Sequence, residues 1–593
     1  MNPSPHCDDV PRHTRPVRRA TTAAVLVALG AGMTQPLSAN AANVANPIVH
    51  SAPKAAIGLN PIGTYETGVF DKGASEIVAY FAAKKRLYKV NAAAAVVEVL
   101  DVSRPASPAK ITDLQTVGVT ADDGSVIGDG ASANSVAVRP DGLGVVAVQN
   151  PVKTEPGWLV FFDARDSSGR ALGAVRVGAL PDMVTVSPDG DYAVVANEGE
   201  PADDYSADPE GTVGIVTLPR RVGAPRQAAV RLAGFTAFDR NPPKGVRSFG
   251  LPGPDGSWLL PSRNWEPEYV TITGSTAYVT LQEANAIASV DLKRAKVAKV
   301  MPLGYKDHGL EQNALDPSDR DGSADIRTVP GLRGFYMPDT IASYRVRGTT
   351  YLVTANEGDA REWGDYAEPI RVKDLGKKGV PPICATSPLA ARTADADLGR
   401  LNVTREDGLS ADGSCYEHLY AFGGRSFSIW TTDGRLVADS GSDIERITAA
   451  AIPGNFNANH TSPQFDSRSD DKGPEPEAVT VGEVDGRSYA FVGLERIGGV
   501  MAFDVSDPRR PTFVTYLNNR DFSVTDPEDN LSASGDLGPE SVVFIPAKDS
   551  PTRRPLLAVG NEVSGTTTLL GVDRTRRATC RPLPRHAFPP SHR

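Results

Sequence analysis

A repeated pairing of acidic residues with short apolar segments constrains this chain more than any other feature. Five times an acidic residue opens an apolar segment, as in LPDMVTV, and a second acidic residue follows about one hairpin later, as in VVANEGE. If each pair brackets two antiparallel strands, both acids lie at the same end of the hairpin, because the chain leaves that end and returns to it. The first members are Asp182, Glu268, Asp339, Glu477 and Glu540, and the second members are Glu198, Glu283, Glu357, Glu495 and Glu562.

The acidic pairs belong to a longer repeat in which an apolar hairpin is followed by a third strand that often ends in Asp. High counts of Gly (56) and Pro (48) with P-D-G and D-G turns favour many short strands. Such a unit cannot bury both faces alone and must stack on a neighbour. We therefore predict an all-β fold, a seven-bladed β-propeller with long rim insertions; one misread unit would make it six or eight. The units begin near Glu76, Asn134, Asp182, Glu268, Asp339, Glu477 and Glu540.

The ends of the chain differ from this repeat. Basic residues between Arg12 and Arg19, an apolar stretch TTAAVLVALGAGM and the sequence Ala39-Asn40-Ala41 predict a signal peptide over residues 1–41. A membrane anchor is the alternative, but the apolar stretch is shorter than the roughly 20 residues that span a bilayer. We expect a linker over 42–59, the propeller over 60–575 with insertions at about 304–334 and 364–425, and a disordered tail over 576–593.

These features predict an exported protein, periplasmic or secreted, with no membrane span after signal removal. A net charge of −10 argues against nucleic acid as a partner. We expect a monomer. Cys7 would leave with the signal, Cys384 and Cys415 can pair in an oxidising compartment, and Cys580 would then be left over.

Around a closed ring, the paired acids would gather at the mouth of the central channel. Like charges at close range raise one another's pKa, so a cation or arginines such as Arg361, Arg425 and Arg496 must compensate them. Ca²⁺ suits such a site because it accepts many oxygen ligands in loose geometry. The alternative is a purely structural role, in which these acids only cap turns and stay solvated. The predicted metal ligands are all ten paired acids together with Asp319 and Asp321.

Asp319 and Asp321 stand in an acidic rim loop, DPSDRDGSAD, which has Gly322 where a calcium loop turns sharply. An EF-hand register would place Pro317 at the first ligand position, so the loop is not an EF-hand.

Catalytic residues are weakly indicated. The sequence contains no H-E-x-x-H, G-x-S-x-G or P-loop motif. The residues to consider for a phosphoesterase are His308, Asp359, Arg361 and Arg496, where arginines would hold phosphate beside bridging calcium. A lone histidine such as His308 is more often a hydrogen-bonding loop residue than a general base.

Several long segments resemble the choice-of-anchor I family, which includes bacterial exported proteins and mesenchyme-specific cell surface glycoproteins of mineralising tissue. They include YLVTANEGDAREWGDY, GPEPEAVTVGEVDGRSYAFVGLERIGGVMAFDVSDP and LGPESVVFIPAKDS, and the resemblance covers about residues 60–573. It implies an exported propeller-type domain. Some bacterial relatives are labelled alkaline phosphatase, but the resemblance supplies no catalytic residue set. The chain ends FPPSHR without an apolar tail or sorting motif, so we do not expect surface attachment.

Three functions therefore follow from the sequence. The first is an exported calcium-binding propeller that engages a cationic, phosphate-bearing or mineral partner through its acidic face. The second is a calcium-dependent phosphoesterase of the alkaline phosphatase or phytase-like kind. The third is a purely structural envelope module.

Overall fold

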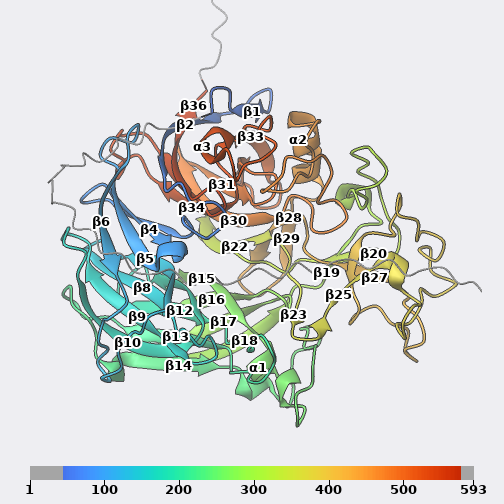
Figure 1. Ribbon diagram of the computed structural model, residues 1–593, viewed down its shortest axis with the longest axis horizontal. Helices are drawn as coiled ribbons and strands as arrows, with labels where there is room; N and C mark the ends of the chain where they lie inside the picture. The colour runs from blue at the N-terminus through green and yellow to red at the C-terminus, as the bar shows by residue number, and fades with distance from the viewer. Residues whose placement is uncertain (1–43, 576–593) are drawn as a thin grey trace, which may run out of the picture. The chain divides into compact units, whose positions relative to one another are not determined.

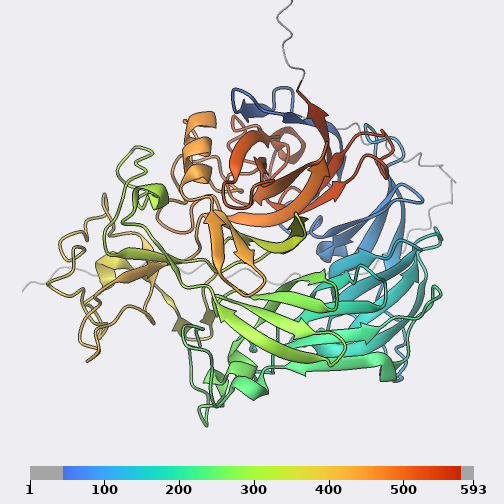
Figure 2. The same ribbon diagram turned by 180° about the vertical axis from the view of Figure 1, so that it is seen from behind.

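The computed structural model describes residues 44–575. The predicted signal peptide (1–41), the tail (576–593), Cys7 and Cys580 lie outside the described residues. Within them the chain forms small, mostly antiparallel sheets that follow one another in sequence order, from β3–β6 in blue to β34–β36 in red (Figures 1 and 2).

Most of these sheets have four strands, and one has five. In chain order they contain β3 (Val78–Phe81), β4 (Arg86–Asn91), β5 (Val96–Asp101) and β6 (Ala109–Gln115); β7 (Ser132–Val138), β8 (Leu143–Gln149), β9 (Pro156–Asp163) and β10 (Ala171–Ala179); β11 (Pro181–Val186), β12 (Tyr192–Asn197), β13 (Thr212–Thr217) and β14 (Val230–Gly234); β15 (Pro267–Thr273), β16 (Thr276–Leu281), β17 (Ala286–Asp291) and β18 (Lys296–Pro302); β21 (Ile341–Val346), β22 (Thr349–Asn356), β28 (Ser426–Thr431) and β29 (Leu436–Asp439); β30 (Pro476–Val484), β31 (Arg487–Leu494), β32 (Val500–Asp504), β33 (Thr512–Asn518) and β1 (Ile48–Ser51); and β34 (Pro539–Ile545), β35 (Leu556–Asn561), β36 (Thr566–Arg574) and β2 (Ile57–Glu66).

The first strands of these sheets contact one another in a closed circuit. In order, β3 contacts β7, β7 contacts β11, β11 contacts β15, β15 contacts β21, β21 contacts β30, β30 contacts β34, and β34 contacts β3. This is the arrangement of a β-propeller, in which each sheet packs on two neighbours. Strands inside a sheet are therefore buried on both faces, as in β8 and β12, whereas the outer strand β6 is mostly exposed.

The N-terminal strands complete the last two sheets, which corrects the prediction of a linker over 42–59. β1 pairs with β33, and β2 pairs along its length with β36, so the two ends of the described chain lie side by side (Figure 1). The physical reason is hydrogen bonding: both segments cover strands that would otherwise present open edges. Neither segment has a P-E or P-D start that marks it in the sequence.

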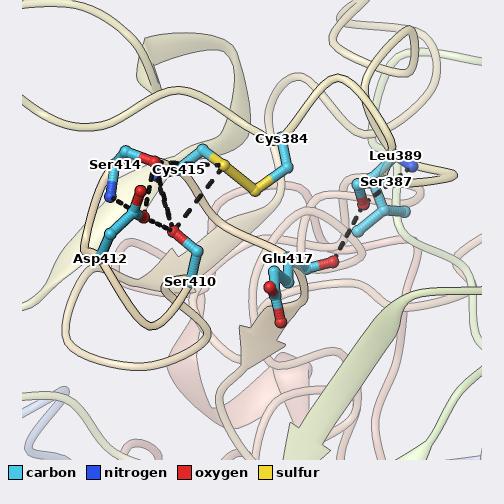
Figure 3. The surroundings of a disulfide bond; sticks show 8 residues. All are labelled: Cys384, Ser387, Leu389, Ser410, Asp412, Ser414, Cys415 and Glu417. Carbon is cyan, nitrogen blue, oxygen red and sulfur yellow. Dashed lines mark hydrogen bonds between the residues drawn. A yellow bond between two sulfur atoms is a disulfide. The ribbon is translucent and has the colours of Figure 1, made fainter.

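The longest insertions form small sheets of their own. β19 (Tyr305–Asp307), β20 (Leu332–Phe335) and β27 (Leu419–Ala421) make one, β23 (Glu362–Trp363) pairs with β24 (Tyr366–Ala367), and β25 (Pro369–Arg371) pairs with β26 (Asn402–Thr404). Cys384 and Cys415 form a disulfide in this region, beside a turn where Ser410 donates to Asp412 (2.7 Å; Figure 3). The pairing that the sequence allowed is thus present.

Helices are short. They are α1 (Pro261–Asn264), α2 (Asp443–Ala451) and α3 (Leu531–Ser534). Within residues 44–575, none of the helices has the length and apolar character needed to cross a membrane.

Candidate functional site: carboxylates of the inner strands

Four of the five acidic hairpins begin with a proline that is followed by a β-bulge. Pro181 is paired with Asn197 at the far end of β12, and the register shifts before Val184. The same irregularity follows Pro267 in β15 and Pro476 in β30. A bulge leaves one residue unpaired and turns its side chain, so the acid after the proline is freed from the regular alternation.

The backbone just before the proline is also unusual. Leu180 has φ 47°, Met337 has φ 45° and Glu475 has φ 50°, all in the left-handed region that non-glycine residues rarely adopt. At the equivalent place before β34 the sequence supplies Gly538, with φ 67°. Strain of this kind costs about 1–3 kcal/mol and tends to be retained at functional sites.

The first acids of four different sheets approach one another. Burial and the surrounding negative charge raise the pKa of the Tyr269 phenol, and the carboxylates responsible are Asp339, Glu540, Asp182 and Glu477. Residues from β11, from the start of β21, from β30 and from β34 therefore surround one side chain of β15. The closed circuit of inner strands explains how positions so far apart in sequence come together.

One set of these acids has no basic partner. Carboxylate oxygens of Asp182, Glu198 and Glu268 lie within 4.8 Å of one another, and all three side chains are half-buried. None of the three forms an ion pair with a residue in the range 44–575. Burial and the charge of Glu200 raise the pKa of Asp182 to about 7, and burial with neighbouring carboxylates raises the pKa of Glu198 and Glu268 well above the usual value. We call this set the unpaired group.

A second set has basic residues among its acids. Oxygens of Glu357, Glu477 and Glu495 lie within 4.8 Å of one another. Lys472 Nζ lies 2.6 Å from Glu357 Oε1, and Arg496 NH1 lies 3.1 Å from Glu495 Oε1. We call these five residues the mixed-charge group. Glu477 Oε2 is buried with no hydrogen-bond partner among the described residues.

Glu475 anchors the basic residues of the mixed-charge group. It is fully buried and contacts Lys472 (3.0 Å), Arg496 (3.0 Å) and Arg468 (2.5 Å). Although burial opposes ionisation, these three cations hold the pKa of Glu475 below its usual value. Sequence reasoning missed this residue because it precedes the proline, two positions before the repeated acid Glu477.

A histidine adds a different donor at the edge of the mixed-charge group. His460 Nδ1 lies 3.2 Å from Glu495 Oε1, and His460, Glu495 and Glu562 have potential ligand atoms within 4.8 Å of one another. Arg496 NH1 also lies 2.7 Å from His460 Nε2. Burial and the charge of Glu495 raise the pKa of Glu562 to about 8.

The other paired acids interact electrostatically with members of the two groups. Asp339 accepts from Thr340 Oγ1 (2.8 Å), and burial and the charge of Glu357 raise its pKa to about 8. Burial and the charge of Glu562 raise the pKa of Glu540 well above its usual value. Burial raises the pKa of Glu283, although the charge of Arg361 opposes this rise. Glu283 Oε2 has no hydrogen-bond partner within residues 44–575.

Two further acids belong here that the predicted ligand set omits. Burial and the charges of Glu562 and Asp182 raise the pKa of Glu76 to about 8. Glu76 opens the first repeat unit, so its position in the repeat could have identified it as a member of the acidic set. Glu200, which pairs with Lys153 (3.3 Å), acts on Asp182 and lies two residues after Glu198.

Asp319 and Asp321 stand elsewhere, in the insertion between β19 and β20. Asp319 accepts from Arg400 Nε at 2.6 Å, and Asp321 lies 3.6 Å from Arg327 NH1. Asp319 is thus paired with an arginine of the insertions, whereas Asp321 has only the more distant contact with Arg327.

Of the arginines expected to compensate the acids, Arg496 contacts one of them. Arg361 instead pairs with Glu266 (2.8 Å), and Arg425 pairs with Glu445 (2.8 Å). Both arginines are almost fully buried, so they stabilise the loops around the site. The larger part of the acidic set has no arginine of its own.

The catalytic candidates are scattered. His308 is buried with Nδ1 2.7 Å from the Asn313 carbonyl, and burial with the charge of Lys306 lowers its pKa to about 3. Asp359 is exposed and lines a polar cavity of about 410 Å³ with Lys472. Only Arg496, among the four candidates in the described chain, contacts a carboxylate of the repeat.

Comparison with known proteins gives two curated relatives. The chain is 33% identical over 290 residues to the mesenchyme-specific cell surface glycoprotein of Strongylocentrotus purpuratus, which covers 43% of this chain and 36% of the relative. It is 33% identical over 200 residues to Gigasin-3a of Magallana gigas, covering 32% of this chain and 68% of that protein. The chain thus spans about a third of the sea-urchin relative.

Among solved structures, the likenesses are distant. Hydrazine synthase of Kuenenia stuttgartiensis aligns at a TM-score of 0.40 and 12% identity, over 86% of this chain and 99% of that one. The β-propeller domain of Cps50 (Swd1) from Myceliophteria thermophila aligns at a TM-score of 0.40 and 9% identity, over 87% and 100%. Likenesses at this level carry no argument about function.

The family match is broader. The model of the choice-of-anchor I domain matches residues 76–508, which include the unpaired group and the mixed-charge group up to Arg496. The chain therefore belongs to the choice-of-anchor I family.

Proposed function

We propose that this protein is an exported, calcium-binding propeller of seven blades that engages a partner through its acidic face. The export signal read from the sequence, the family and the name of the sea-urchin relative, a cell surface glycoprotein, support an extracellular setting. Calcium is abundant there. The seven blades would be the sheets whose first strands form the closed circuit.

The observation that carries the proposal is the unpaired group. Three carboxylates whose oxygens lie within 4.8 Å, with no ion pair to a described basic residue, repel one another when ionised. A cation placed among them would remove that repulsion. Oxygen-only ligands favour a hard ion, and Ca²⁺ tolerates the irregular geometry of ligands from two bulged strand starts and one strand end better than Mg²⁺ does.

Calorimetric titration with calcium chloride tests the metal. We expect heat of binding with wild-type protein and a strongly weakened response in an Asp182→Asn/Glu268→Gln double variant. Glu483→Gln is the matched control because Glu483 is exposed on β30, away from the bulge. Equal binding by wild type and the double variant would contradict the proposed ligands. No binding at millimolar calcium would favour the structural-module alternative.

The acidic face also suggests the class of partner. A calcium ion held by a carboxylate-lined opening keeps coordination positions for outside oxygen atoms, as in phosphate, sulfate or a mineral surface. We propose that the partner carries such oxyanions or a cationic patch. Binding to hydroxyapatite or calcium carbonate particles, with and without chelator, tests this; retention that ignores both calcium and the double variant would contradict it.

A calcium-dependent phosphoesterase is the second candidate, and the mixed-charge group favours it. Lys472 and Arg496 provide cationic donors, and His460 a ring nitrogen, next to carboxylates, the combination needed to hold a phosphate beside a metal. Release of phosphate from a phosphomonoester or phytate, measured with calcium and with chelator, tests this activity. Activity that survives Arg496→Ala or His460→Gln would exclude this site as its source.

A further inference from the structure

A second set of oxygen atoms lies in the insertions, apart from the repeat acids. Asp316 and Asp321 stand between β19 and β20, whereas Asn457 and Asp466 stand between α2 and β30. Arg425 donates to the Asp316 carbonyl (2.7 Å) in the first segment and to the Ser469 carbonyl (2.8 Å) in the second, so the two segments lie against each other. The charges of Asp316 and Asp321 also act on Asp466. The predicted ligands Asp319 and Asp321 came from the first segment alone.

Three oxygens of this set are buried and have no hydrogen-bond partner among residues 44–575. They are Asp466 Oδ2, Asn457 Oδ1 and Asp321 Oδ2. Asp466 is 2% exposed and Asn457 is 0% exposed. Burying such atoms without a partner is unfavourable, so each one requires a reason.

The rest of the local hydrogen bonding fixes the orientation of these oxygens. Asn457 Nδ2 donates to Glu445 Oε1 (3.0 Å) and to Ser469 Oγ (2.8 Å), so turning the amide over would lose both bonds. Ser469 Oγ in turn donates to Asp466 Oδ1 (2.5 Å), which leaves Oδ2 free. Two acceptor oxygens on neighbouring side chains are thus held in place without donors.

The local charge is also unbalanced. Asp316 and Asp466 form no ion pair with a residue that the structure describes. Arg425 forms an ion pair with Glu445 (2.8 Å). Arg327 lies closer to Asp325 and Asp397 (each 2.8 Å) than to Asp321. Burial and the charge of Glu445 raise the pKa of Asp316 to about 7, and burial raises that of Asp466 to about 8.

We infer that Asp466, Asn457 and Asp321, with the charge of Asp316 nearby, bind a second calcium ion that joins the two insertions. A carboxylate, an amide oxygen and a second carboxylate are typical calcium ligands, and the ion would supply the missing partner for all three buried oxygens at once. Its role would be to hold together segments that are separated by more than a hundred residues of sequence. This site does not depend on the unpaired group, because no ligand is shared.

Thermal unfolding and equilibrium dialysis of the full mature chain with calcium alone test the inference. In chelator at a pH above 8, where the Asp466 carboxyl is ionised, Asp466→Asn should unfold at the same temperature as wild type or higher, because a buried unpaired charge is removed. In millimolar calcium it should bind one ion fewer per chain than wild type. Asp365→Asn, at an exposed position in the β23–β24 turn, is the control and should match wild type in both measurements.

Two additional variants keep the test decisive. Asp321→Asn, at a half-buried position, should weaken the same binding event if Asp466→Asn proves difficult to fold. In the Asp182→Asn/Glu268→Gln background, one calcium ion should still bind, and adding Asp466→Asn should abolish it. Undiminished stoichiometry in both Asp466→Asn and Asp321→Asn would overturn the inference, whatever happens at the unpaired group.

Discussion

The unpaired group and the mixed-charge group arise from the same repeated hairpin but resolve their charge differently. Asp182, Glu198 and Glu268 have no basic partner in the described chain, whereas Glu357 and Glu495 contact Lys472 and Arg496. The difference comes from the segment before β30, in which Lys472 contacts both Glu357 and Glu475, and Arg468 contacts Glu475. The mixed-charge group thus carries its own counter-charge, whereas the unpaired group has none among the described residues.

The largest effect should come from breaking the built-in counter-charge. Lys472→Ala leaves Glu475, which is fully buried, and Glu357 without their lysine. Removing one partner of a buried ion pair destabilises a protein by about 3–5 kcal/mol. Urea unfolding measures this change. Lys377→Ala, where an exposed lysine pairs with Asp374 at 3.3 Å, is the control and should change stability by less than about 0.5 kcal/mol.

A smaller effect should follow from adding calcium to wild type near pH 8. Binding to the native state at a hundredfold excess over Kd raises the free energy of unfolding by about 2.7 kcal/mol for each site. The Asp182→Asn/Glu268→Gln variant should lose the share that belongs to the unpaired group, whereas Glu357→Gln should keep most of it. If Glu357→Gln alone removed the whole calcium effect, the mixed-charge group would be the metal site and the comparison would be reversed.

The stability of the metal-free protein should depend on pH, because several acids of the site have raised pKa values. Raised pKa values of about 7 for Asp182 and about 8 for Asp339 mean that the native state holds protons that the unfolded state, with carboxyl pKa values of about 4, has released. The free energy of unfolding should therefore fall as pH rises from about 5 to 8 in chelator. Calcium should remove most of this fall and should have little effect at pH 5. A stability that rises over this range without metal would contradict the assignment.

The smallest expected effect is on the free energy of unfolding when the unpaired group is neutralised by mutation and calcium is removed by chelator. Asp182→Asn/Glu268→Gln removes two mutually repelling charges, so near pH 8 the variant should be more stable than wild type by about 1 kcal/mol. Denaturant unfolding compares the two proteins. A clear loss of stability would mean that these carboxylates make contacts that an amide cannot replace.

The repeat itself could be predicted from the sequence because every hairpin carries the same local signal. A P-D or P-E start, a Val-rich strand and a return to N-E-G bring Asp182 next to Glu198, and the pairing of Pro181 with Asn197 agrees. The all-β propeller followed from the need of such sheets to stack. The blade count and the metal stay predictions.

Other features depended on contacts that no local pattern specifies. β1 and β2 are short segments that become strands because they cover β33 and β36. Lys472 and Glu475 lie in an irregular loop before β30, so the contact of Lys472 with Glu357 depends on the tertiary fold. Arg361 and Arg425 were expected at the acids but instead form buried ion pairs with Glu266 and Glu445.

Anomalous diffraction from crystals grown with calcium, or with a lanthanide in its place, shows whether the unpaired group binds a metal ion. We expect a strong peak within coordination distance of Asp182, Glu198 and Glu268, and its disappearance in the Asp182→Asn/Glu268→Gln variant. Fully occupied metal elsewhere with none among these three carboxylates, in crystals where the side chains are ordered at pH 8, would contradict it.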